Sequence, residues 1–132
     1  MITALLIATL TLTSVTTETD TRTAKVTTLD TTDALGFTAL MYAARSQDLI
    51  LFDYLIEHGA DVNARNNAGA TAVFIAARHG NIQAVARLIA AGADLTIKNN
   101  NGQTAYDVAV IYEKEMIASL IKRHQQAQMA RM

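Results

Sequence analysis

"GADVNARNNAGATA" at residues 59–72 returns as "GADLTIKNNNGQTA" at residues 92–105, a shift of 33 positions. The same period is kept elsewhere in the chain. The turn glycines Gly36, Gly69 and Gly102 are 33 residues apart, and one residue after each glycine comes a Thr-Ala pair. Agreement at so many positions predicts a structural repeat of this length.

The composition limits what such a chain can be. With 132 residues, about half of them apolar, it has the size of one small domain with one modest core. The formal net charge is −1 and the charged residues are interspersed, so no basic face for nucleic acid is indicated. Because there is no cysteine, disulfides and thiolate zinc sites are excluded, and stability must come from packing.

Each unit is predicted to form two short helices and a finger loop. In the second unit, Thr71 is placed to cap a first helix with its hydroxyl, and Gly80 and Asn81 end that helix. A second, amphipathic helix follows, which Gly92 ends in the left-handed conformation. An extended stretch then leads to the turn at residues 99–102. Because neither helix is long enough to be stable alone, the pairs must stack, which predicts a solenoid.

The repeat unit resembles a known family. Residues 33–44 read DALGFTALMYAA, and the unit closes with GADVN at residues 59–63. This resembles the ankyrin repeat, D-x-x-G-x-T-P-L-H-x-A-A followed by a second helix and G-A-D-V-N. The resemblance implies an all-α fold, an ankyrin-repeat solenoid of stacked helix pairs with β-hairpin-like finger loops.

The resemblance also divides the chain. An ankyrin-repeat domain is expected over residues 33–132, with repeats at 33–65, 66–98 and 99–131. The third repeat lacks the closing glycine finger and is expected to end in a charged helix over residues 113–123, which would form a C-terminal cap.

Two positions at the start of each first helix depart from the family pattern. The family has proline and histidine there, and this chain has alanine at the first position and other residues at the second: Ala39, Ala72 and Ala105, then Met41, Phe74 and Asp107. The Thr-Pro-His bond network is therefore predicted to be weakened in all three units, with first helices that fray and a marginally stable fold.

The second helix of the first unit, around Ile50, is apolar on nearly every side and is expected to need a cover. The cover would come from residues 1–32. Residues 2–12, ITALLIATLTL, are too short to span a membrane, which takes about 20 residues. The apolar segment 1–13 is either an export signal or a capping helix that packs Leu5, Leu6 and Leu10 on Leu49, Ile50 and Phe52. Residues 14–32 are rich in threonine and are predicted to be a linker.

The location of the protein depends on which alternative holds. An export signal would place it in the periplasm or outside the cell, and a capping helix is compatible with the cytoplasm.

No enzyme site is indicated. His58, His79 and His124 show no metal-ligand spacing, and no nucleophile and base are paired with them. The Asn-rich turn at residues 99–102 also lacks the pattern of a phosphate-binding loop. Catalytic, cofactor and metal sites are therefore not expected.

In the ankyrin family, finger tips and first helices line a shallow groove that binds a protein partner. Transferred position by position, the resemblance implies a partner-binding surface made of Leu35, Phe37, Arg45, Ser46, Arg65, Asn67, Arg78, His79, Lys98, Asn100, Gln103 and Tyr112. The basic residues in this set predict an acidic partner segment, with Phe37 and Tyr112 as anchors and Arg45 and Arg78 as charge contacts. Alternatively, the arginines are ordinary solvated charges.

The predicted function is a non-catalytic protein–protein interaction module, monomeric, without a membrane span and without a nucleic-acid partner. The alternative is a structural or chaperone-like accessory protein of the bacterial periplasm.

Overall fold

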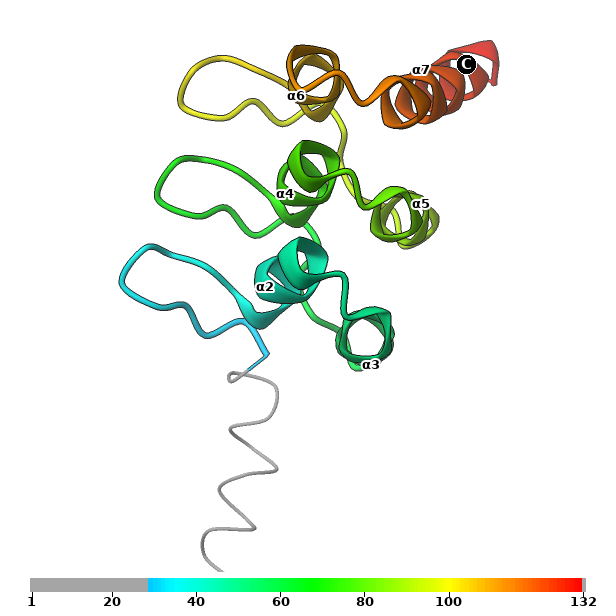
Figure 1. Cartoon of the computed structure of the whole chain (residues 1–132). Coiled ribbons are helices and arrows are strands. Elements are labelled where there is room, and N and C mark those ends of the chain that lie inside the picture. The colour runs from blue at the N-terminus through cyan, green and yellow to red at the C-terminus, as the bar shows by residue number, and fades with distance from the viewer. Residues whose placement is uncertain (1–28, 132) are drawn as a thin grey trace, which may run out of the picture.

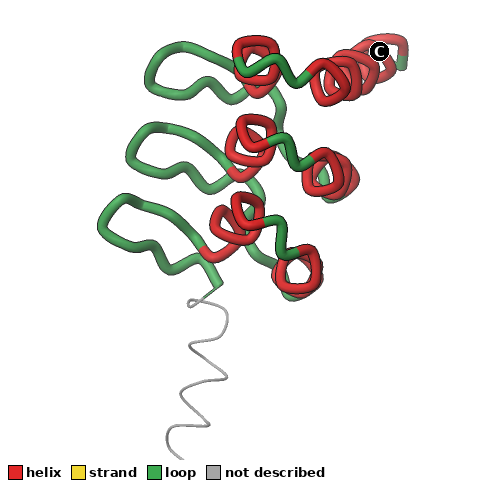
Figure 2. Tube along the Cα trace, in the orientation of Figure 1, coloured by secondary structure: helices red, strands yellow, loops and turns green. Residues whose placement is uncertain are grey.

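The computed structural model describes residues 29–131, and within them it has six helices and no strand. The helices are α2 (Ala39–Ser46), α3 (Leu49–Glu57), α4 (Ala72–His79), α5 (Ile82–Ala90), α6 (Ala105–Ile111) and α7 (Glu115–Ala130). They form three stacked pairs, with α2, α4 and α6 in one column and α3, α5 and α7 in a second (Figure 1). The loops that join the repeats all project to the same side (Figure 2). The predicted helical solenoid is therefore confirmed.

The proposed roles of the N-terminal region are not addressed by this structure. The apolar segment 1–13 and the part of the linker before Leu29 lie outside the described residues. The choice between export signal and capping helix, and the location that follows from it, therefore stay predictions.

Each finger loop is closed by the side chain at its base. In the second finger the Asn66 N–H donates to the carbonyl of Ala70 (2.9 Å), and Asn66 Oδ1 accepts from the N–H groups of Ala68 and Ala70. Asp33 and Asn99 hold the first and third fingers in the same way. Short polar side chains that bond to the backbone a few residues on are typical of such turns. The fingers are thus closed loops rather than strand ladders.

Successive fingers are joined by asparagine side chains. Asn67 Nδ2 donates to the carbonyl of Ala34 (3.0 Å), and Asn100 Nδ2 donates to the carbonyl of Asn67 (2.9 Å), each across 33 residues. The backbone N–H groups of the same asparagines donate to Leu35 and Ala68, both at 3.0 Å. Each finger is thereby bonded to the next through both the side chain and the backbone of one asparagine.

The turn glycines allow this close approach. A Cβ atom added at Gly36 would lie 2.7 Å from Oδ1 of Asn67, and one added at Gly69 would lie 2.6 Å from Oδ1 of Asn100. Gly102 has a similar positive φ, 75° against 78° at Gly69, but no atom lies within 4 Å of its added Cβ. Gly36 and Gly69 are therefore required for finger stacking as well as for the turn.

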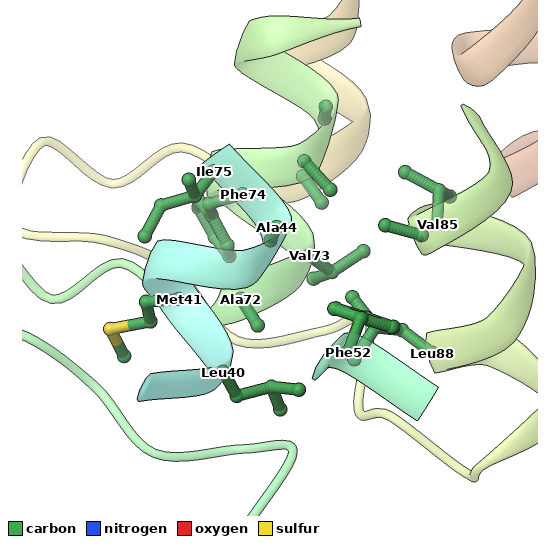
Figure 3. Close-up of a cluster of buried hydrophobic side chains, with 14 of the residues drawn as sticks. Leu40, Met41, Ala44, Phe52, Ala72, Val73, Phe74, Ile75, Val85 and Leu88 are labelled. Atoms are coloured by element: carbon green, nitrogen blue, oxygen red, sulfur yellow. The ribbon is translucent and has the colours of Figure 1, made fainter. Parts of the chain in front are cut away.

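The core lies between the two columns of helices. Small residues on the inner helices, such as Ala43, Ala44 and Ala76, are completely or almost completely buried, which lets α2 and α4 pack closely. Phe52 of α3 is also fully buried and lies beside Leu88 of α5 (Figure 3). The prediction that Phe52 belongs to the surface awaiting a cover is therefore wrong, because its ring points into the stack.

The first repeat does expose apolar side chains at its open end. Ile50 is 87% exposed, as expected. Leu51 is 40% exposed, whereas Ala84, at the same position of the next repeat, is fully buried. Tyr42 is likewise exposed while its equivalent, Ile75, is buried. The positions of Leu51 and Tyr42 are buried in the later repeats, which stack on a preceding helix pair, whereas the position of Ile50 is exposed in the later repeats as well, at Gln83 and Met116.

Two of the three first helices keep a reciprocal cap despite the altered family pattern. Thr38 Oγ1 accepts from the N–H of Met41 (3.2 Å), and Met41 Sδ accepts from the N–H of Thr38 (3.5 Å). Thr104 and Asp107 make the same exchange through the Asp107 carboxylate, at 3.3 and 3.0 Å. The first and third repeats thus keep a reciprocal cap, with a thioether and a carboxylate as the acceptor, and the predicted fraying and marginal stability stay predictions.

The middle repeat is the exception. Thr71 is 1% exposed, and its hydroxyl finds no hydrogen-bond partner within residues 29–131. The prediction that this hydroxyl caps the helix is therefore wrong, although Thr71 does occupy the N-cap position of α4. Phe74, at the position of Met41 and Asp107, has no acceptor atom with which to complete the exchange.

The last helix also differs from expectation. The sequence predicts a charged helix over residues 113–123, but α7 begins at Glu115 and continues to Ala130. Glu113 has a φ of 58°, and Gly80 and Gln47 at the same repeat position are also left-handed. Glu113 therefore belongs to the turn between the helices rather than to the helix.

The finger contact leads to a test with a matched pair of glycines. Gly69→Ala is expected to lower the free energy of unfolding more than Gly102→Ala. Both changes put a side chain on left-handed backbone, at about 1–2 kcal/mol, but only the first also collides with Asn100. Urea denaturation measures the difference, and equal losses would show that the finger contact contributes nothing.

The helix caps lead to a second test. Thr104→Val is expected to lower the free energy of unfolding by about 0.5–2 kcal/mol, because it removes a formed cap bond. Thr71→Val removes a buried hydroxyl without a partner, so stability is expected to stay the same or to rise. Urea denaturation of both variants is the measurement. A loss at Thr71 equal to that at Thr104 would mean that the hydroxyl is bonded in solution.

Candidate functional site

A groove of about 460 Å³ lies between the fingers and the inner helices. One wall comes from the second and third fingers, with Asn66, Asn99, Asn101 and Gln103. The other comes from the last turns of α2 and α4 and the end of α6, with Arg45, Arg78, His79 and Tyr112. Apolar residues line the rest, among them Phe37, Ala70, Phe74, Ile75 and Val108. All three repeats therefore contribute to one surface.

The groove is cationic although the protein as a whole is nearly neutral. Arg45 and Arg78 line it, and none of its lining residues is aspartate or glutamate. The two arginines are equivalent residues of successive repeats, each in the last turn of its helix. Two like charges in one shallow groove without an acidic neighbour favour an anionic ligand.

Aromatic rings stand near both ends of the groove. The guanidinium carbon of Arg78 lies 5.2 Å from the ring centroid of Tyr112, within the range of a cation–π contact. The Phe37 ring packs against Tyr42, with the centroids 5.2 Å apart. The Tyr42 hydroxyl donates in turn to the carboxylate of Asp33. Both rings are therefore held in place by neighbouring side chains.

The Tyr42–Asp33 bond shifts the pKa of both groups. The hydroxyl of Tyr42, together with the backbone N–H groups of Phe37 and Leu35, lowers the pKa of the Asp33 carboxyl. The carboxylate in turn raises the pKa of the Tyr42 hydroxyl. At neutral pH the pair is therefore a charged acceptor and a neutral donor, which keeps Phe37 at the edge of the groove.

His79 lies among cations at the end of α4. Partial burial lowers its pKa, and the positive charges of Arg78, Arg45 and Lys114 lower it further. The imidazole is therefore neutral at pH 7, and its protonation would add a charge to a region that is already positive.

The structure divides the predicted binding residues into two groups. Phe37, Arg45, Arg78, His79, Gln103 and Tyr112 line the groove. The others are not among its lining residues: Leu35, Ser46, Arg65, Asn67, Lys98 and Asn100. Leu35 is exposed at its finger, and the hydroxyl of Ser46 donates to the carbonyl of Ala43.

Three members of the second group help to hold the fingers together. Asn67 and Asn100 make the bonds between fingers described above. The Arg65 guanidinium donates through Nη2 to the carbonyl of Lys98 (2.8 Å) and through Nε to that of Gly69 (3.2 Å). These polar atoms are engaged with the backbone, and their first role is structural.

Sequence reasoning missed part of the groove. Asn66 and Asn99 line it at the finger bases, and Phe74, Ile75 and Val108 contribute apolar surface. The sequence does contain a signal for Phe74, because an apolar ring stands at a position where the family has a polar histidine. No signal in the sequence distinguished Ile75 and Val108 from ordinary core residues.

Residues 29–131 contain no group of three or more His, Cys, Asp or Glu residues that could hold a metal ion. None of the helices described there is long and apolar enough to cross a membrane.

The stacked helix pairs, bonded fingers and shared groove define a helical repeat protein of the solenoid class. The family model for ankyrin repeats, in three copies, matches residues 40–130. The chain belongs to the ankyrin-repeat family. Ankyrin repeats are generally protein–protein interaction modules, bind protein partners, and are typically non-catalytic.

The surroundings of His79 predict how stability depends on pH. Because folding lowers the pKa of His79 below the ordinary value of 6.5, the unfolded chain takes up this proton first as the pH falls. The contribution of the neutral His79 to the free energy of unfolding is therefore fully present above pH 6.5, and it is lost as the pH falls through the folded-state pKa. His79→Gln is expected to reduce this loss, measured by urea denaturation at a series of pH values. Parallel curves for wild type and variant would contradict the expectation.

A titration of His79 followed by NMR tests whether the neighbouring positive charges help to lower its pKa. Arg45→Gln removes one of the neighbouring positive charges and is expected to raise the pKa of His79 relative to wild type.

Proposed function

We propose that this protein is an interaction module whose groove binds an acidic, extended segment of a partner protein. The observation that carries the proposal is the lining of the groove, which has two arginines and no acidic residue. The general function, protein–protein interaction, is that of the ankyrin-repeat family.

The groove offers both charge and shape for such a segment. Arg45 and Arg78 provide charge-assisted hydrogen bonds to carboxylates, which are stronger than neutral ones. Phe37 and Tyr112 provide aromatic surface of the kind that dominates binding energy at protein interfaces. The finger wall adds amides, through Asn101 and Gln103, which can bond to the backbone of an extended chain.

The alternative role as a periplasmic accessory protein depends on residues 1–13, and no feature of residues 29–131 favours it over the groove. The predicted monomeric state also stays a prediction.

A displayed library of random 12-residue peptides tests the proposal. Wild-type protein is expected to enrich peptides rich in Asp and Glu, because such peptides complement the groove. The double variant Arg45→Glu with Arg78→Glu is expected to bind the selected peptides about tenfold or more weakly, as measured by fluorescence anisotropy.

The control makes the same charge change away from the groove. Lys122 and Arg123 are exposed on α7 and do not line it. The double variant Lys122→Glu with Arg123→Glu is expected to bind the selected peptides as wild type does. Equal weakening in both double variants would indicate general electrostatic attraction and would overturn the groove proposal.

A further inference from the structure

The groove changes character along the stack. The last turn of the first helix carries Arg45 in the first repeat and Arg78 in the second, whereas Ile111 stands at the same position in the third. Ile111 does not itself line the groove, but it is 55% exposed and lies one turn after Val108 and directly before Tyr112, which both line it. At the next position the neutral imidazole of His79 in the second repeat is replaced by the larger aromatic ring of Tyr112 in the third. The surface is thus cationic over α2 and α4 and apolar over α6.

The spacing of the repeats predicts how far apart the matching residues lie in a ligand. Packed helices lie about 8–10 Å apart, and an extended chain advances about 3.3 Å per residue. One repeat therefore corresponds to about three residues of an extended ligand. A chain lying across the three inner helices meets Arg45, Arg78 and Ile111 at every third residue.

We propose that the groove selects a segment with two acidic residues and one apolar residue, three positions apart, with the apolar residue at the end over α6. The inference rests on the proposed function and adds the order of the residues to it. An apolar residue placed between the two acidic ones would lie over Arg78 and would lose a charge contact there.

Synthetic peptides of identical composition test the order. The ordered peptides contain Asp-x-x-Asp-x-x-Phe or its reverse, Phe-x-x-Asp-x-x-Asp, because the groove does not define the chain direction. The shuffled peptide contains Asp-x-x-Phe-x-x-Asp. All have Gly or Ser at x and blocked ends. At least one ordered peptide is expected to bind wild-type protein about fivefold to tenfold more tightly than the shuffled one, measured by fluorescence anisotropy.

A change of specificity provides the sharper test. Ile111→Arg extends the row of arginines to the third repeat and is expected to shift the preference toward Asp-x-x-Asp-x-x-Asp. The control is Met116→Arg, which adds the same charge at a 74% exposed position of α7, in the column of helices that does not line the groove (Figure 1). It is expected to keep the wild-type preference. Because both sites are exposed, neither change should disturb folding.

The outcomes separate the two proposals. Equal binding of ordered and shuffled peptides, each weakened by Arg45→Glu with Arg78→Glu, would overturn the inference and leave the acidic groove standing. An equal shift of preference in Ile111→Arg and Met116→Arg would also overturn the inference. Binding of none of these peptides, or binding that the arginine reversals do not weaken, would overturn both.

Discussion

The hydrogen bonds between successive finger loops are the constraint on which the rest of the structure depends. Asn67 and Asn100 each donate a side-chain amide to a carbonyl 33 residues earlier. These bonds set the distance between fingers, and the glycines at positions 36 and 69 make that distance possible. One wall of the groove is built from the fingers, so its shape follows from the same contacts. Loops without regular secondary structure can form a defined surface because each holds its neighbour.

The repeats share a scaffold but not a surface. Positions that face the interior keep small or apolar residues in each unit, as Ala43, Ala76 and Ala109 show. Positions on the groove side vary, and Arg45, Arg78 and Ile111 occupy the same place in three units. Stacking requires only the first set to be periodic. The second set is therefore free to differ from repeat to repeat, and that freedom gives the groove its change from cationic to apolar.

The sequence was sufficient for the architecture because the period and the turn glycines are local signals. Of the twelve residues that it predicted for partner binding, six line the groove, and their role in binding stays a prediction. Arg65 and Asn67 lie in the fingers, as the pattern indicated, but their polar atoms bond to the backbone of a neighbouring finger. Sequence spacing can place a side chain in a loop, whereas its partner depends on how the repeats stack. The predicted cap of Thr71 is a separate case: its hydroxyl does not accept from the backbone N–H of Phe74, and Phe74 has no side-chain acceptor for a return bond from the N–H of Thr71.

Phe74 belongs both to the incomplete cap of α4 and to the lining of the groove. Phe74 is 2% exposed and contributes to the groove lining, at the position where Met41 and Asp107 complete the caps of the other repeats. A polar residue there could bond to Thr71, but it would replace the apolar surface beside Ile75. Local rules of helix formation are most often broken at functional sites, where another requirement competes with stability. The middle repeat therefore breaks the capping rule at a residue that belongs both to the buried core and to the groove lining, while the first and third repeats keep the rule.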